Sequence, residues 1–254
     1  MTESFEKTKL AGSIASGALD EVNNLIKPGI STLEIDKLCY EFINDHNAYS
    51  APLYYRGYPK TCCTSTNHVV CHGIPSEKIL NNGDIVNVDV TAIKDQWHGD
   101  TSRMFVVGEC SVKAKKLIKI TYNAMMRAIN IIKAGIKIGN IGYTIQKSVE
   151  AEGFSVVKDF CGHGIGKKFH QSPNVLHYGE KDSGQELKAG MIFTIEPMIN
   201  SGRFETKTLK DGWTAVTKDK SLSAQFEHTI GVTKEGYEIF TLSKKGLNFP
   251  PYKK

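Results

Sequence analysis

Two stretches of the chain are near copies of each other and decide its fold: Leu80-Asn81-Asn82-Gly83-Asp84-Ile85-Val86-Asn87-Val88-Asp89 and Leu187-Lys188-Ala189-Gly190-Met191-Ile192-Phe193-Thr194-Ile195-Glu196. Each has a glycine-containing turn that leads into a strand with one carboxylate. Because side chains alternate between the faces of a strand, Asp89 and Glu196 project opposite their aliphatic neighbours. A carboxylate in a covered space is unfavourable unless a cation compensates it, so the paired placement predicts a metal pocket between two halves.

The repeat extends upstream of these stretches. Ile26-Lys27-Pro28-Gly29-Ile30 recurs as Ile132-Lys133-Ala134-Gly135-Ile136, each copy followed by a helix-like segment. The nearly constant offset favours one duplicated unit over two unrelated loops with similar turn chemistry. We therefore expect a single domain over residues 1–254, with halves of about 1–110 and 111–245 related by a pseudo-twofold axis. The fold class is α+β, with a curved, antiparallel-rich sheet covered by helices on one face.

The spacing of apolar residues predicts the elements of each half. A helix is expected over residues 3–26, and Ser31-Thr32-Leu33-Glu34 has the form of a capping box that opens a second helix. A strand is expected over 102–107. The second half is expected to repeat this plan with helices near 113–133 and 138–152, strands near 154–160, 190–196 and 225–233, and a polar hairpin between Ile199 and Trp213.

Composition is that of an ordinary globular protein: of 254 residues, 40% are hydrophobic and 23% are charged. No apolar run reaches the roughly 20 residues that cross a bilayer, and Met1–Lys7 lacks the layout of a signal peptide. The six cysteines show no C-x-x-C spacing and are expected to be reduced thiols. These features predict a cytoplasmic protein that does not contact membranes.

The net charge of +5 is modest and most lysines are scattered. A basic surface of this size usually reflects solvated faces, so we expect no specific nucleic-acid partner. A further hypothesis is loose contact with the ribosome surface near the exit tunnel.

Three further side chains join Asp89 and Glu196 as candidate metal ligands. Asp100 precedes a predicted strand, and Glu227 lies on the polar face of another, at comparable places after the two repeat copies. His163 lies among glycines that let the backbone approach a site and hold the imidazole in a strained turn. A single carboxylate at a strand end is more often a turn residue, but the duplicated placement favours ligands.

Four carboxylates in one cavity require cations, and four carboxylates with one imidazole suit two divalent ions. Oxygen-rich ligation favours Mn(II), Fe(II) or Co(II) over a closed, sulfur-rich zinc site, although the identity, zinc included, stays open. Two adjacent metal ions would activate water and stabilise the charge of a tetrahedral intermediate, as amide hydrolysis requires.

The sequence resembles the methionine aminopeptidases, specifically the type I form, and by extension the pita-bread metallopeptidases. The resemblance runs from the first predicted helix to about residue 243. It is carried by these ordered motifs: Cys71-His72-Gly73-Ile74-Pro75, Asn87-Val88-Asp89-Val90, His98-Gly99-Asp100-Thr101-Ser102, Gly162-His163-Gly164-Ile165-Gly166, Phe169-His170, Thr194-Ile195-Glu196-Pro197-Met198 and Ser223-Ala224-Gln225-Phe226-Glu227-His228-Thr229. Any one motif alone would be weak.

The resemblance implies a hydrolase that removes the initiator methionine from nascent polypeptides when the next residue is small. It implies two divalent ions per chain, bridged by Asp100 and Glu227 and held by Asp89, Asp100, His163, Glu196 and Glu227. Glu196 would also be the general base. His72 would contact the scissile amide nitrogen, and His170 would donate to the carbonyl oxygen or its oxyanion. The implied methionine pocket is walled by Tyr55, Tyr58, Phe169 and Trp213.

Three residues depart from the pattern of this family. Pro52 stands where many type I enzymes have a pocket cysteine, and Gln171-Ser172 follows His170 where acidic residues are frequent. The resemblance also implies a monovalent cation, held by backbone carbonyls of the loop 61–67. His177 has no partner that the sequence identifies and is interpreted as a surface or packing residue.

Two other functions are weighed against methionine removal. An aminopeptidase P or prolidase would use the same ligand types but usually carries an additional N-terminal domain, whereas here the first repeat begins almost at Met1. A non-catalytic pita-bread binding protein typically loses ligands, and this chain retains all five. Type II methionine aminopeptidases carry a helical insertion in the second half, and the segment between His163 and Glu196 is too short to contain it. This supports the type I form. The protein is expected to be a monomer.

Overall fold

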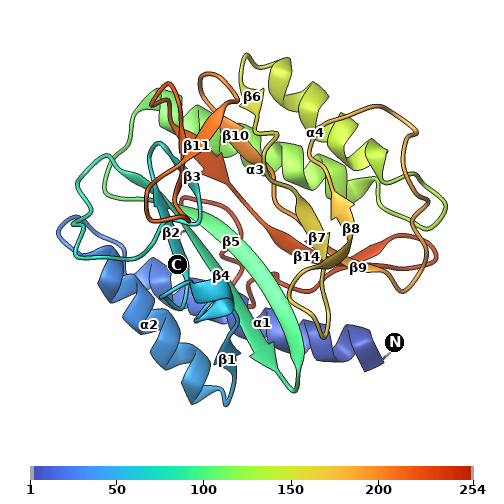
Figure 1. Cartoon of the computed structure of the whole chain (residues 1–254), viewed down its shortest axis with the longest axis horizontal. Coiled ribbons are helices and arrows are strands. Elements are labelled where there is room, and N and C mark those ends of the chain that lie inside the picture. Colours follow the sequence, from blue (N-terminus) through green and yellow to red (C-terminus); the bar gives the residue numbers. More distant parts are fainter. Residues whose placement is uncertain (1–2, 253–254) are drawn as a thin grey trace.

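The computed structural model describes residues 3–252 as four helices and fifteen strands (Figure 1). The helices come in two pairs, one in each half of the chain: α1 (Glu3–Leu25), α2 (Thr32–Asp45), α3 (Val112–Asn130) and α4 (Gly139–Glu150). A single 3-10 turn, η1, spans Tyr55–Gly57. Both pairs lie close to the predicted positions, which confirms the helical plan of the two halves.

Every strand pairing is antiparallel, and hydrogen bonding divides the strands into four sheets. The first half forms the order β1-β4-β2 with β5 on β4, from β1 (Tyr49–Ser50), β2 (Cys63–Thr66), β4 (Ile85–Lys94) and β5 (Trp97–Val106). The second half forms the order β15-β14-β9-β7-β8, from β7 (Gly162–Gly164), β8 (Gln171–Val175), β9 (Ile192–Ile195), β14 (His228–Val232) and β15 (Tyr237–Ile239).

Two smaller sheets complete the fold. One has the order β13-β10-β6, from β6 (Ser155–Val156), β10 (Met198–Asn200) and β13 (Ser223–Gln225). The other has the order β11-β12-β3, from β3 (Val69–Cys71), β11 (Thr206–Thr208) and β12 (Ala215–Thr217). The polar hairpin therefore begins later than predicted, because β10 pairs with β6 and β13 and only β11 and β12 form the hairpin.

The repeated sequence forms the same hydrogen-bonded structure in both halves. Gly29 N–H donates to the Leu80 carbonyl at 2.9 Å, and Gly135 N–H donates to the Leu187 carbonyl at 2.9 Å. The reciprocal bonds, from Leu80 N–H to Ile30 and from Leu187 N–H to Ile136, are both 2.8 Å long. Each copy thus ties the turn before a helix to the turn before a strand, and so sets where that strand begins.

The second helix begins where the sequence places it. Ser31 accepts a hydrogen bond from Glu34 N–H, and the Glu34 carboxylate accepts one from Ser31 N–H, which is the reciprocal capping box. These bonds satisfy backbone donors that the first turn of a helix leaves free.

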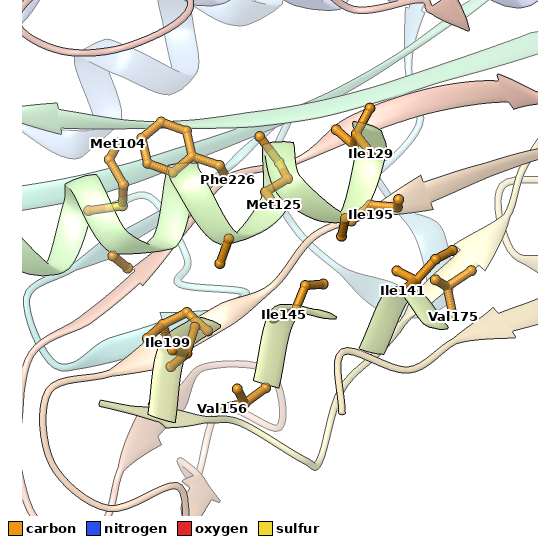
Figure 2. Packing of buried hydrophobic residues seen from close by; sticks show 14 of the residues in the cluster. Met104, Met125, Ile129, Ile141, Ile145, Val156, Val175, Ile195, Ile199 and Phe226 are labelled. Atoms are coloured by element: carbon orange, nitrogen blue, oxygen red, sulfur yellow. The ribbon is translucent and has the colours of Figure 1, made fainter. Parts of the chain in front are cut away.

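Each helix pair packs on strands of its own half (Figure 1). Apolar residues of α1 and α2 form one core with the aliphatic faces of β4 and β5, including Leu19, Ile35, Val88 and Phe105. A second core joins α3 and α4 to strands of the second half, and Figure 2 shows Met125, Ile145, Ile195, Ile199 and Phe226 meeting there. Because both cores take one face of the strands, the opposite, polar faces are left for a cavity. Among residues 3–252, no helix combines the length and the apolarity needed to span a membrane.

Candidate metal centre

The polar faces of both halves border one cavity of about 530 Å³. The first half contributes Asp89 and Asp100 to its lining, and the second half contributes His163, Glu196 and Glu227. All five side chains predicted as metal ligands therefore face the same space.

The β4–β5 hairpin brings the two aspartates together. Asp89 is aligned with Ser102 and Thr91 with Asp100, so both carboxylates project from one face of adjacent strands. The Thr91 hydroxyl donates to Asp100 Oδ1 at 2.7 Å, and the backbone N–H of Asp100 donates to the Thr229 hydroxyl at 3.0 Å. These bonds fix the orientation of Asp100 across the boundary between the halves.

The prediction that Asp100 precedes its strand is wrong, because it lies within β5, which begins at Trp97. Gly99 lies inside this strand as well. In the structure it gives room to α1, since a Cβ at Gly99 would overlap the backbone of Gly12. A glycine inside a strand here marks a close helix contact rather than an end.

His163 is presented by β7, between two glycines. Its Nε2 lies 3.6 Å from both Asp100 Oδ2 and Glu196 Oε1, and its backbone N–H donates to the Thr194 hydroxyl at 3.0 Å. The predicted strained turn is wrong, since residues 162–164 form a strand. The flanking glycines are needed because a Cβ at either would overlap a neighbouring carbonyl, of Thr194 or of Ser172.

Glu196 is buried at the end of β9 and held by three neighbours. Thr194 donates to Oε1 at 2.8 Å, and Gln225 Nε2 lies 3.4 Å from Oε2. The backbone N–H of Glu196 donates to Nε2 of His177 at 3.1 Å. His177 is thus a packing residue that directly supports a site residue, a role that the sequence alone did not indicate.

Glu227 lies between β13 and β14 rather than inside one continuous strand. Its backbone N–H donates to the Ser102 carbonyl at 3.1 Å, in an isolated bridge that joins the sheets of the two halves. Its carboxylate is buried, and Oε1 has no hydrogen-bond partner among the described residues. An orphaned carboxylate oxygen in a cavity fits a site that binds a cation.

Burial and mutual repulsion act on the acidic groups of the cavity. Burial, together with the charges of neighbouring carboxylates, raises the pKa of Asp89 and of Glu227 well above the ordinary range. Burial also raises the pKa of Glu196 to about 7, against the opposing effect of His163. Burial opposes protonation of His163, but its Asp100 and Glu196 neighbours raise its pKa.

These features test whether the residues fit a metal ion. Asp100, His163 and Glu227 offer ligand atoms that all lie within 4.8 Å of one another. Asp89 and Glu196 line the same cavity. Oxygen-rich ligands with one imidazole suit divalent ions, which would also compensate the buried negative charge. The donor set therefore fits.

Two other histidines face the cavity. His72 has a left-handed backbone with φ of 55°, and its ring lies edge-on to Phe160 at 5.4 Å and to Trp213 at 6.2 Å. His170 lies beside His163, with ring centroids 4.2 Å apart. Burial lowers the pKa of both rings, that of His170 to about 4, so both are neutral hydrogen-bonding groups at neutral pH.

Aromatic side chains form a wall of the cavity. Tyr58 and Trp213 meet edge to face at 5.1 Å, and Tyr55 and Phe169 at 5.0 Å. The Tyr58 hydroxyl donates to the carbonyls of Cys62 and Gly73 at 3.0 and 3.1 Å, so its apolar ring faces the cavity without an unsatisfied polar atom. Lining residues that the sequence did not indicate are Arg56, Cys63, Thr91, Asp159, Phe160, Cys161, Asn174 and Met198.

Comparison with known proteins agrees with this geometry. Residues 6–234 match metallopeptidase family M24, and the chain belongs to this family. It is 56% identical to methionine aminopeptidase of Rickettsia prowazekii over 98% of this chain and 96% of that protein. It is 54% identical to methionine aminopeptidase of Escherichia coli K12 over 95% of this chain and 92% of that protein.

Solved structures show the same fold. The crystal structure of the Rickettsia prowazekii methionine aminopeptidase superimposes with a TM-score of 0.94 at 56% identity, covering 95% of this chain and 98% of that chain. Prolidase from Pyrococcus furiosus has a TM-score of 0.77 at 22% identity, covering 96% of this chain but 65% of that chain. The prolidase likeness shows the fold alone. The antiparallel α+β architecture is thus the pita-bread fold that the sequence predicts.

Proposed function

We propose that this protein removes the N-terminal initiator methionine from nascent polypeptides, with preference for a small second residue. The observation that carries this proposal is the meeting, in one cavity, of a carboxylate–histidine cluster with an aromatic wall. The aromatic slot of Tyr55, Tyr58, Phe169 and Trp213 suits a polarizable thioether. The near-complete length match to methionine aminopeptidases supports this activity over X-Pro cleavage, since prolidase-type chains are matched over only part of their length.

Two divalent ions would be held by Asp89, Asp100, His163, Glu196 and Glu227, with Asp100 and Glu227 shared between them. The oxygen-rich set favours Mn(II), Fe(II) or Co(II), with Zn(II) as a further candidate. When bound, such ions polarise a scissile carbonyl and make water acidic near neutral pH.

Residues of the chain would position the substrate and move protons. Glu196 takes up a proton from the attacking water at its carboxylate, a role suited to a pKa raised to about 7 by burial. His170 donates to the carbonyl oxygen of the scissile bond, and His72 contacts the amide nitrogen. The acidic cavity also attracts the free ammonium of a chain end, which restricts cleavage to the first residue.

We further propose that residues 1–254 act as one catalytic domain, as a monomer in the cytoplasm. Its partner is the N-terminus of a nascent polypeptide, with loose contact to the ribosome surface near the exit tunnel. A monovalent cation at the loop 61–67 would be a structural addition.

Peptide hydrolysis tests the proposal. With added Mn(II) or Co(II), the protein should release methionine from a Met-Gly-Ser peptide and leave an Ala-Pro peptide intact. The Asp100→Asn variant, of nearly equal volume, should lose at least about 100-fold in kcat/KM. Cleavage of Ala-Pro alone would favour an X-Pro peptidase. Absence of cleavage with every metal would favour a binding protein.

A further inference from the structure

Two loops from opposite halves of the chain meet at the mouth of the cavity. The Tyr55 hydroxyl, in η1, lies 3.0 Å from Nδ1 of His170. Its ring also contacts the Phe169 and His170 rings, with centroids 5.0 and 5.2 Å away. The tyrosine therefore does more than line the pocket, since it bonds a side chain that the proposed function uses.

The fold holds Tyr55 in place at a conformational cost. Its neighbours Tyr54 and Arg56 have φ of 66° and 48°, in the left-handed region that L residues rarely adopt. Such backbone conformations are unfavourable and persist where the surrounding structure over-determines them, often at functional sites. Here the loop is closed by the bond from Tyr54 N–H to the Tyr58 carbonyl at 2.7 Å, and Tyr58 itself is buried.

We propose that Tyr55 is a positioning residue that donates its hydroxyl proton to Nδ1 of His170 and so fixes the imidazole tautomer with hydrogen on Nε2. This inference rests on the proposed function, in which His170 is a donor to the scissile carbonyl. A neutral imidazole has one donor and one acceptor nitrogen. When the Tyr55 hydroxyl donates to Nδ1, Nδ1 is the acceptor and Nε2 is the nitrogen that carries hydrogen. Among the hydrogen bonds of residues 3–252, the Tyr55 hydroxyl has one partner, Nδ1 of His170 at 3.0 Å.

The Tyr55→Phe variant separates the hydroxyl from the ring that lines the pocket. In the Mn(II)-loaded enzyme it should lower kcat for a Met-Gly-Ser peptide about tenfold, with KM within about twofold, because one hydrogen bond to His170 is lost while the wall stays. Tyr54→Phe is the matched control, since Tyr54 is 80% exposed and lies beside Tyr55, and it should keep full activity. An unchanged kcat in Tyr55→Phe would overturn the proposal.

A double-mutant cycle tests whether Tyr55 acts through His170. In a His170→Ala background, adding Tyr55→Phe should cost no more than about twofold, because the bond is already absent. The same tenfold loss in both backgrounds would overturn the proposal, because the hydroxyl would then act independently of His170.

Imidazole ¹⁵N resonances test the tautomer without relying on activity. In the Zn(II)-loaded full-length protein, His170 should show an unprotonated Nδ1 and a protonated Nε2, and Tyr55→Phe should shift this ratio. Hydrogen on Nδ1 in the unaltered protein would overturn the proposal. A protein inactive on methionyl peptides that still shows the expected tautomer would refute the proposed function but not the bond that Tyr55 makes.

Discussion

The backbone N–H of Glu196 donates to Nε2 of His177 at 3.1 Å, so a buried histidine outside the cavity lining holds the chain at the proposed general base. Burial lowers the pKa of His177 to about 3, so the ring is neutral and its Nε2 remains an acceptor at neutral pH. His177 therefore stabilises the position of the Glu196 backbone through a neutral ring that accepts its hydrogen bond.

Replacing His177 by leucine should destabilise the protein by about 1–3 kcal/mol, because it leaves a buried N–H without an acceptor. His177→Gln, which offers an acceptor at similar reach, should recover a good part of the loss. Urea unfolding of the full-length variants measures both. A leucine variant as stable as the unaltered protein would show that the bond contributes nothing.

The metal-free protein should lose stability as pH rises from about 4 toward 7 through its cavity carboxylates. Burial raises the folded pKa of three of them, Asp89, Glu196 and Glu227, so the folded state keeps protons that the unfolded chain has released. That contribution is fully present below the unfolded pKa of about 4 and is lost as pH passes the folded values. His177 and His228, which are buried and neutral, have the opposite effect. The protein loses stability as pH falls below about 6.5, because the unfolded chain then takes up protons on these two rings.

The Glu227→Gln variant isolates the carboxylate contribution, because the histidines are common to both proteins. In the presence of a chelator, the free energy of unfolding of the variant, relative to that of the unaltered protein, should increase by more than about 1 kcal/mol between pH 4 and pH 7. Adding Mn(II) should reverse the order at pH 7 by stabilising the unaltered protein more. If the difference in stability between the two proteins did not depend on pH, folding would not raise the pKa of Glu227, and the prediction would be wrong.

The glycines around His163 supply a test with an internal control. Gly164→Ala would place a Cβ against the Ser172 carbonyl, so it should cost about 1–3 kcal/mol and weaken metal binding by displacing β7. At Gly166 the nearest atom to an added Cβ is Trp97 Cζ3 at 3.4 Å, an ordinary contact. Gly166→Ala should therefore be nearly neutral. Thermal unfolding and metal titration compare the two variants, and equal effects would contradict a steric requirement for glycine at position 164.

The chain's two tryptophans provide a similar comparison for the pocket. Trp213 lines the cavity against Tyr58, whereas Trp97 lies outside its lining, under the Lys167 ammonium at 5.7 Å. Trp213→Leu should raise KM for methionyl peptides about tenfold through lost contact area, while Trp97→Leu should change it little. Steady-state kinetics on one peptide compares the two variants. An unchanged KM in Trp213→Leu would show that Trp213 does not contact the methionine side chain.

The sequence predicts the two halves well because local rules act strongly there. The Ser31 capping box and the repeated turns around Leu80 and Leu187 depend on neighbouring residues, and the structure forms each of them as expected. The alternation of Val86, Val88 and Asp89 likewise predicts which face is polar, since a strand has period two.

Other features depend on contacts between distant segments, which one sequence does not reveal. Gly99 and Gly164 lie inside strands, where they make room for the backbone of α1 and for the Ser172 carbonyl. The bond from Glu196 to His177 and the bridge from Ser102 to Glu227 likewise join elements far apart in the chain. Their register follows from packing rather than from local preference.

Anomalous scattering from crystals of the Mn(II)-loaded protein tests the assignment of five side chains as the ligands of two metal ions. This assignment predicts two peaks at the manganese edge inside the cavity, in contact with Asp89, Asp100, His163, Glu196 and Glu227, and the loss of both peaks in Glu227→Gln crystals grown at the same metal concentration. Peaks elsewhere, or a cavity without any manganese signal, would contradict it.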